Sequence, residues 1–290
     1  MTMSEALRVY IERFAGSTRK TMTQRLKSFI MYVDTICVDD VGLITTAQIE
    51  QWLLELCKRD LKPWSVYVYL SAVRHLFTAL HNEGCLARNP WPKHVKTKRP
   101  VHSIRCVPSS ERMIEVLEAA SRCSYPCRTR TILELGYGCG LRRMELCNLN
   151  INDIEGDTVR IRGKGGKERL VPLGDTARQW LEKYLYGERL QAVRAHNPHE
   201  IALFVSEYGK RLGVGSYEVM IRQIRSACSV KSITMHSLRH ACATHMLRNG
   251  ASIMVLSKLL GHEHVTTTEI YTKVTTDDLR TVLTNKHPRG

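Results

Sequence analysis

The sequence has no apolar run long enough to cross a membrane. No stretch of its 290 residues approaches the ~18 consecutive apolar residues that a transmembrane helix needs. The first residues, Met1-Thr2-Met3-Ser4-Glu5, also lack the basic region followed by an apolar segment that is typical of a secretory signal. We therefore expect a soluble, intracellular protein.

Closely paired cysteines are also missing. The ten cysteines include no C-x-x-C pair, and the two nearest are Cys123 and Cys127. Most of them stand singly in apolar, periodic stretches, where a reduced thiol packs as a small core residue. The sequence therefore favours structural thiols over a disulfide framework or a cysteine-based zinc site.

A nucleotide-binding loop is not indicated either. Gly163-Lys164-Gly165 has the composition of a phosphate loop, but the spacing G-x-x-x-x-G-K-[ST] is absent. The segment instead lies between residues 158–162, which alternate in the manner of a strand, and residues 168–173, which suit a returning strand. This pattern predicts a β-hairpin with Lys164 at its tip.

Acidic residues are few, and one long segment has none. The chain has 43 Lys plus Arg against 28 Asp plus Glu, a net charge of +15, which favours nucleic acid as a partner over the alternative of a merely soluble basic protein. Residues 84–110 contain no carboxylate but six Lys or Arg and four prolines. We expect an extended basic linker over residues 93–107, either a simple spacer or, as we favour, a strap along a phosphate backbone.

The residues before this linker show helical periodicity. Apolar positions recur at helical spacing in four stretches of residues 1–92, which predicts a small helical bundle. Basic residues lie along and between these helices and in the linker; any one of them is a solvated surface charge by default, but several together could bind DNA phosphates. The DNA-binding candidates are Arg19, Lys20, Arg25, Lys27, Lys58, Arg59, Lys62, Arg74, Lys96, Lys98 and Arg99.

Residues 108–146 predict further helices and a glycine-flanked turn. Ser109-Ser110-Glu111 suits a helix start, and a second helical pattern runs from about residue 128 to Gly136. The turn that follows opens into another helix, with Arg142 near its positive end. Backbone N–H groups and the guanidinium could face one phosphate there.

A dense set of reactive side chains follows between residues 236 and 271. His236 and Arg239 lie three apart in a helical pattern. A second helix, with Ile253 on its apolar face, is expected to end at Gly261, directly before His262. Tyr271 comes nine residues after His262. A lone Tyr or His is usually a partly buried structural residue, but their joint spacing with an Arg suits phosphoryl transfer through a phosphotyrosine.

Together these motifs resemble those of the tyrosine recombinases, the phage-integrase family, and most closely its small Xer-type members. The motifs are G-L-R-x-x-E-L, G-K-G-x-K-E-R-x-V-P-L, H-x-L-R-H-x-x-A-T-H, L-L-G-H and the tyrosine nine residues later. The likeness is close from about residue 108 to 275 and limited to size and pattern before that. Arg143-Met144 departs from it, since small or aliphatic residues are more usual there.

The resemblance implies a mainly α fold with a small β-hairpin or sheet (α+β) in two domains. Residues 1–92 would be a helical, DNA-binding core-binding domain, residues 93–107 the basic linker and residues 108–290 the catalytic domain. The implied catalytic residues are Arg142, Lys164, His236, Arg239, His262 and the nucleophile Tyr271, with Glu145 as a supporting residue.

The resemblance also implies a role for each side chain. Tyr271 would attack the scissile phosphate, leaving a 3′-phosphotyrosyl link and a free 5′-hydroxyl, while Arg142 and Arg239 clamp the non-bridging oxygens. Lys164 would protonate the leaving 5′-oxygen, and His236 would act as general base or proton donor.

His262 would hydrogen-bond a non-bridging oxygen, and Glu145 would orient the site. Because the covalent link preserves the energy of the phosphodiester, no ATP is needed. We expect no metal or other cofactor.

Three other interpretations stay open. His236 and His240 lie four apart on a helix, with His245, His262 and His264 nearby, which could make a zinc site, although the Glu of H-E-x-x-H is absent. A type IB topoisomerase would use similar residues to nick and reseal one duplex. A DNA-binding accessory protein with a silent site is the third. In the recombinase interpretation, we expect His240 and His245 to be buried helix residues.

The end of the chain predicts one more helix. Leu279, Val282 and Leu283 share one of its faces, which could pack on its own domain or, as we favour, dock in a neighbouring protomer. The resemblance implies a homo-tetramer on double-stranded DNA with paired inverted-repeat sites, in the cytoplasm and associated with the nucleoid.

Overall fold

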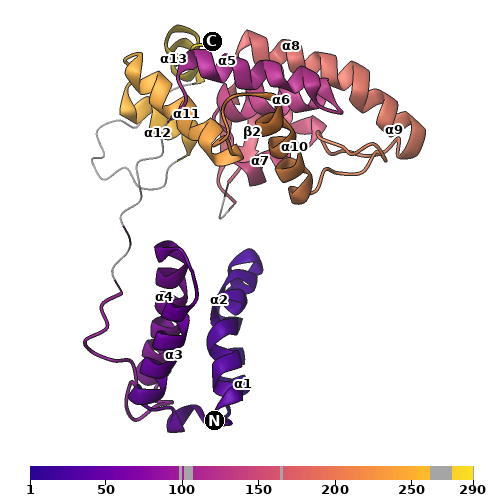
Figure 1. The fold of residues 1–290 in the computed structure, drawn as a ribbon. Helices are drawn as coiled ribbons and strands as arrows, with labels where there is room; N and C mark the ends of the chain where they lie inside the picture. The colour runs from indigo at the N-terminus through magenta and orange to yellow at the C-terminus, as the bar shows by residue number, and fades with distance from the viewer. Residues whose placement is uncertain (98–99, 101–106, 164–165, 262–275, 290) are drawn as a thin grey trace. The chain divides into compact units, whose positions relative to one another are not determined.

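The computed structural model describes residues 1–97, 100, 107–163, 166–261 and 276–289. The chain divides into two compact units, Met1–Arg105 and Cys106–Gly290, each described by itself below (Figure 1). The DNA-binding, linker and catalytic roles expected for residues 1–92, 93–107 and 108–290 stay predictions.

The first unit is a helical bundle. Its helices are α1 (Met3–Glu12), α2 (Gly16–Thr35), α3 (Thr46–Lys58) and α4 (Pro63–Asn82), with a 3-10 turn η1 (Val41–Leu43) before α3. Thr2 and Thr45 close capping boxes at the starts of α1 and α3, and Pro63 starts α4 with the backbone angle that a first helical turn needs. The predicted four-helix pattern is confirmed.

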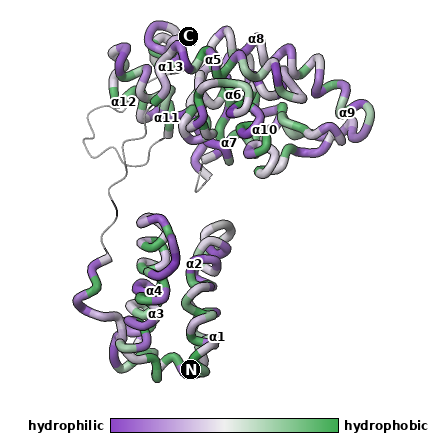
Figure 2. The backbone as a smooth tube through the Cα atoms, in the orientation of Figure 1, coloured by the Kyte–Doolittle hydropathy of each residue, from purple (hydrophilic) through white to green (hydrophobic). Residues whose placement is uncertain are grey.

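Aromatic rings hold this bundle together. Phe29 of α2 packs edge-on against Trp52 of α3 and Phe77 of α4, with ring centroids 5.1 Å and 5.6 Å away. All three side chains are buried. In Figure 2, hydrophobic and hydrophilic stretches alternate along the helices, as expected where each helix buries one face.

The end of the expected first domain and the first part of the expected linker pack on this bundle. Trp91 is buried, Val95 packs against the same core, and Arg74 of α4 donates from Nη1 to Oγ1 of Thr97 over 2.6 Å. Residues 98–99 and 101–106 lie outside the described residues. The segment up to Thr97 is therefore anchored to the helical unit instead of standing free of it.

The second unit is mainly helical with a small sheet. Its elements are α5 (Ser110–Glu118), α6 (Pro126–Tyr137), α7 (Arg143–Asn148), β1 (Ile154–Glu155), β2 (Thr158–Arg162), β3 (Glu168–Pro172), α8 (Asp175–Tyr184), α9 (Leu190–His196), α10 (Val214–Ala227), α11 (Met235–Arg248), α12 (Ile253–Leu260) and α13 (Thr276–Lys286). Two 3-10 turns, η2 (Ala119–Arg122) and η3 (Ile151–Asp153), and a π-helical turn η5 (Leu185–Arg189) connect some of them.

The sheet contains the predicted hairpin. In the described residues the strand order is β1-β2-β3, all antiparallel, with Arg162 opposite Glu168 and Val159 opposite Val171. The strands predicted at residues 158–162 and 168–173 are confirmed, β3 ending one residue earlier. β1 was not predicted, because two residues are too short for an alternating pattern.

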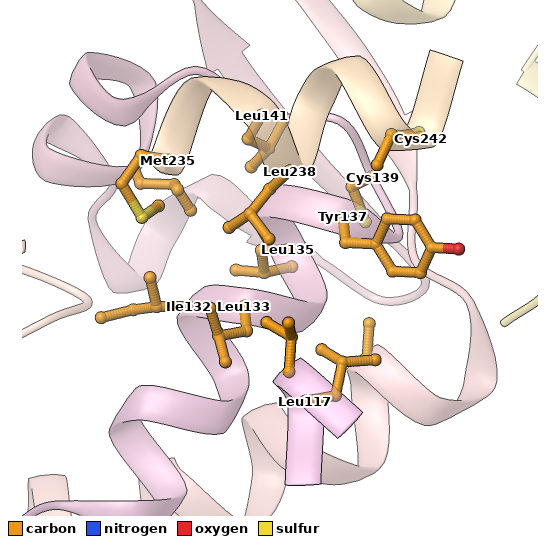
Figure 3. Close-up of a cluster of buried hydrophobic side chains, with 14 of the residues drawn as sticks. Leu117, Ile132, Leu133, Leu135, Tyr137, Cys139, Leu141, Met235, Leu238 and Cys242 are labelled. Atoms are coloured by element: carbon orange, nitrogen blue, oxygen red, sulfur yellow. The ribbon is translucent and has the colours of Figure 1, made fainter. Parts of the chain in front are cut away.

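Helix α6 runs through the centre of the second unit. Ile132, Leu133 and Leu135 are wholly buried, and Leu135 lies in the cluster formed with Leu238 of α11 and the aromatic Tyr137 (Figure 3). Gly136 allows this close packing, because a Cβ there would be 3.0 Å from the side chain of Leu238. α11, which carries His236 and Arg239, is thereby fixed to the core.

The cysteines that the structure describes are free thiols. Among the nine described, Cys123, Cys139, Cys147, Cys228 and Cys242 are buried, as predicted for core residues, and Cys127 is half-buried. Cys37, Cys57 and Cys85 are exposed, so the core prediction is wrong for them. Burial raises the pKa of Cys139 to about 12, which keeps this thiol protonated and unreactive.

Candidate active site

Arg142 stands at the start of α7 and is held by Glu145. The backbone N–H and Nη1 of Arg142 donate to Oε2 and Oε1 of Glu145, each over 2.8 Å. The backbone N–H of Arg142 therefore already has its acceptor in Glu145. That N–H groups of this helix start face a phosphate stays a prediction. The Arg142 side chain is 42% exposed and keeps a face open to a ligand.

Glu145 is a buried carboxylate with a second arginine partner. Arg169 of β3 approaches it as a fork, with Nη1 2.8 Å from Oε1 and Nη2 2.9 Å from Oε2. Burial pushes the pKa of the Glu145 carboxyl upward, but the hydrogen bonds and charge of Arg169, together with the hydrogen bonds from Arg142, outweigh burial and lower the pKa. Glu145 is therefore ionised near neutral pH.

Arg239 is the third guanidinium of this group, and it is buried. Its Nη1 donates to the carbonyl oxygen of Gly140 and its Nη2 to that of Leu260, each over 2.7 Å. Burial, followed by the positive charge of Arg142, lowers its pKa to about 10, which still leaves it protonated near neutrality. A buried cation held on neutral carbonyls is suited to attract an anion.

The end of α12 is where the three arginines meet. The carbonyl oxygens of Leu259, Leu260 and Gly261 accept hydrogen bonds from Arg169, Arg239 and Arg142, respectively. The last carbonyls of a helix lack helical partners and carry partial negative charge, so the arginines satisfy and stabilise them. Gly261 ends α12 in the left-handed conformation, with φ +66°, as predicted.

Gly140 leaves room for this arrangement. It has φ +66°, and a Cβ there would be 2.5 Å from Cδ2 of Leu260. A side chain at this position would be strained at the positive φ and would have to displace the side chain of Leu260.

The histidines of this region have different environments. His236 is exposed at the start of α11, three residues before the buried Arg239. His240 is exposed, so its predicted burial is wrong: the helix turns this position away from the core. His245 is buried as predicted, between the Tyr137 hydroxyl at 2.8 Å and the Pro108 carbonyl at 2.9 Å. Ile253, expected on the apolar face of α12, is also exposed.

Three of the predicted catalytic residues lie outside the described residues: Lys164, His262 and Tyr271. The described chain reaches them on both sides, through Gly163 and Gly166 in the hairpin and through Gly261 at the end of α12. Of the predicted set, the structure brings together Arg142, Glu145 and Arg239. It adds Arg169, which sequence reasoning missed although it stands in the motif G-K-G-x-K-E-R.

The predicted DNA-binding residues of the first unit are mostly exposed. Arg19, Lys20, Arg25 and Lys27 lie on α2, and Arg25 alone of these is half-buried. The remaining described candidates, all exposed, are Lys58, Arg59, Lys62, Arg74 and Lys96. Lys98 and Arg99 lie outside the described residues. Exposure leaves these side chains accessible to a phosphate backbone, and the contact stays a prediction.

Helix α13 packs on its own unit in this single chain. Leu279 and Leu283 are buried, and Val282 packs against the same core. Beyond the helix, His287 is buried against the ring of Tyr137, with centroids 4.7 Å apart, and Arg289 donates to the buried Glu134 over 2.8 Å. Docking of this helix in a neighbouring protomer stays a prediction.

Two other features of the described residues bear on the alternatives. They contain no helix with the length and apolar character to cross a membrane. Nor do they contain a group of three or more His, Cys, Asp or Glu side chains that could hold a metal ion.

Comparisons with known proteins identify related chains. The model of the phage integrase family matches residues 109–277. The chain is 36% identical to tyrosine recombinase XerD of Oceanobacillus iheyensis over 77% of this chain and 75% of that protein. It is 32% identical to tyrosine recombinase XerC of Proteus mirabilis over 97% and 92%.

Solved structures show the same fold. A lambda integrase dimer bound to a COC′ core site is similar with a TM-score of 0.70 at 20% identity, over 95% of this chain and 99% of that one. A lambda integrase tetramer bound to a Holliday junction gives 0.69 at 19% identity, over 94% and 81%. The mainly α architecture with a small antiparallel sheet is therefore confirmed. On the family match and the identity to the two Xer relatives, the chain belongs to the phage integrase family.

Proposed function

We propose that this protein is a site-specific DNA recombinase, which cleaves and rejoins DNA through a 3′-phosphotyrosyl intermediate and exchanges strands between two sites. The observation that carries the proposal is the gathering of Arg142, Glu145 and Arg239 at the end of α12, directly before His262 in the sequence. The family and the tyrosine recombinases among its relatives support it.

The charge of the site suits the reaction. The site has three positive side chains and one negative side chain, an excess of two positive charges: Arg142, Arg169 and Arg239 against Glu145. A phosphodiester under attack gains negative charge on its non-bridging oxygens, and fixed donors stabilise that charge without reorganising.

In the proposed reaction, Tyr271 attacks the phosphorus and displaces the 5′-oxygen of the next nucleotide. Arg142 and Arg239 stabilise the phosphate, Lys164 supplies the proton for the leaving oxygen, and His236 accepts or donates the proton of the tyrosine. His262 hydrogen-bonds a non-bridging oxygen. Attack by a 5′-hydroxyl of the second DNA reverses the step and completes the exchange.

The nucleophile gives the decisive test. With Tyr271→Phe, a nicked suicide substrate should be bound but should form no covalent protein–DNA adduct. Tyr186→Phe is the matched control, since Tyr186 is 78% exposed in η5 and should be dispensable. An adduct with Tyr271→Phe would overturn the assignment. Two results with the wild-type protein would favour the alternatives. An adduct with relaxation of supercoiled DNA but no strand exchange would favour a topoisomerase. DNA binding without any adduct would favour an accessory protein.

The partner in this proposal is double-stranded DNA with paired inverted-repeat sites, and a nucleoid location follows. The net charge of +15 supports a polyanionic partner. The solved lambda integrase structures with this fold are bound to a core site and to a Holliday junction, and the latter is a tetramer. We extend a tetramer on DNA to this chain, with α13 exchanged between protomers.

Removing residues 277–290 tests the assembly. Single-site binding should stay nearly intact, while cooperative binding to paired sites and the balance of cleavage between strands should be lost. Because Leu279 and Leu283 are buried on their own unit, thermal unfolding must be measured alongside, and mixing with full-length Tyr271→Phe separates cis from trans effects. Unchanged synapsis and cleavage would show that exchange of this helix does not matter.

A further inference from the structure

The reaction proposed above assigns Arg169 no proton transfer and no contact with the phosphate, yet this residue lies at the centre of the arginine cluster. It belongs to β3, the returning strand of the hairpin that carries Lys164. It contacts Glu145 of α7 and the end of α12, so one side chain joins three elements of the site.

The contacts of Arg169 hold its guanidinium in one orientation. Two parallel hydrogen bonds run to the oxygens of Glu145, and Nε donates to the carbonyl oxygen of Leu259 over 3.0 Å. Gly261 packs on it so closely that a Cβ there would be 3.1 Å from Nη1 and 3.2 Å from Cδ. The Arg169 side chain is 14% exposed, which leaves it little access to solvent or DNA.

The charges show what this fork does for Arg142. Glu145 is 5% exposed at its side chain and needs a positive partner to remain ionised there. With Arg169 bound to both oxygens, Arg142 can share the carboxylate and still present its own charge at its exposed face. Without Arg169, the carboxylate would be paired with Arg142 alone and would cancel that charge.

We propose that Arg169 is a positioning residue for DNA cleavage: it neutralises Glu145 so that Arg142 keeps its charge for the scissile phosphate, and it holds the hairpin against the end of α12. This inference rests on the proposed function. It deepens that function by placing a residue that acts on the phosphate only through Arg142.

The test separates DNA binding from cleavage. Arg169→Gln should bind a single site within about threefold of the wild type, but its adduct formation on a nicked suicide substrate should slow by about 100-fold, as expected when a buried ion pair loses one partner. Adding Glu145→Gln should restore a large part of the rate, because the double variant no longer has a carboxylate that captures Arg142. A purely structural role for Arg169 would not give this rescue.

Two further variants complete the comparison. Arg169→Lys keeps the positive charge but loses the paired hydrogen bonds to Glu145, and should slow cleavage by about 10-fold. If Arg169→Gln unfolds below the assay temperature, Arg169→Lys takes its place in the test. Arg178→Gln is the matched control, because Arg178 is an exposed arginine of α8 that pairs with Asp157, and it should cleave within about threefold of the wild type.

Cleavage by Arg169→Gln at the wild-type rate would overturn the inference, and so would a double variant as slow as a folded Arg169→Gln. Failure of the proposed function is recognised separately, since the wild type itself would then form no adduct at Tyr271.

Discussion

Arg239 donates from Nη2 to the carbonyl oxygen of Leu260 over 2.7 Å, which ties α11 to the last residue of α12. The contact joins a buried cation to the backbone directly before the segment that contains His262 and Tyr271. The same guanidinium donates from Nη1 to the carbonyl oxygen of Gly140. The Arg239 side chain, which we propose binds the phosphate, thus also holds two backbone segments in place, at Gly140 and at Leu260.

Replacing Arg239 by lysine should keep the positive charge but lose this planar pair of bonds. A lysine cannot place two donors in the same fork, so we expect cleavage to slow by about 10²–10³-fold, the range for loss of an aligned donor to a developing oxyanion. Adduct formation on a suicide substrate measures the effect, with gel-shift binding of a single site nearly unchanged. Arg248→Lys, at the exposed end of α11, is the control. A lysine variant that cleaved normally would contradict the role of the fork.

Lys164→Ala should slow cleavage by about 10²–10⁴-fold if the lysine protonates the leaving oxygen. A 5′-bridging phosphorothiolate substrate should restore much of the rate, because its sulfur leaves without a proton. Lys167→Ala, a change in the same hairpin, should need no such rescue. If the sulfur substrate failed to help the Lys164 variant, the lysine would instead position the phosphate.

Cleavage and strand exchange should proceed in excess EDTA and without ATP. His236 and His240 are exposed, whereas His245 is buried and already bonded to Tyr137 and Pro108, so these three histidines do not converge on one ion. The measurement is recombination after dialysis against chelator, compared with the untreated protein. Activity that disappeared and returned with zinc or magnesium would revive the histidine site.

The stability of the second unit should fall as the pH drops from 6.5 toward 4, in part because of His287. Burial, and then the charge of His245, lower the pKa of His287 from 6.5 to about 4. The unfolded chain therefore binds the proton first, and stability is lost as the pH falls through this window, by up to about 3 kcal/mol. Burial lowers the pKa of His245 too, so its contribution has the same sign.

The free energy of unfolding, measured against denaturant between pH 4 and 7, checks this prediction. His287→Phe keeps a ring against Tyr137 but cannot titrate, so its pH dependence should be weaker. His240→Gln changes an exposed histidine and should leave the pH dependence unchanged. A His287→Phe protein with the wild-type slope would show that another group is responsible.

Local spacing in the sequence determined the secondary structure around the site. Ser109 caps a helix where predicted, Gly261 ends α12 in the left-handed conformation, and β2 and β3 form the predicted hairpin. Each of these features depends on neighbours within a few residues, so the pattern of side chains is sufficient to predict it. The order of the motifs likewise identified the family.

Only the tertiary structure decided which groups share the site. Arg169 and Glu145 are 24 residues apart, and the carbonyls that accept from Arg142 and Arg239 are 119 and 21 residues away in the chain. Periodicity places a residue on a helix face but does not say what lies opposite, which is why Ile253 was wrongly expected to be buried. The burial expected for His240 came from the resemblance to the recombinases, and it was wrong because the packing of α11 leaves this position exposed. The physical reason is that a backbone carbonyl becomes an acceptor for a distant guanidinium only when the packing of α11, α12 and the sheet brings the two within hydrogen-bonding distance.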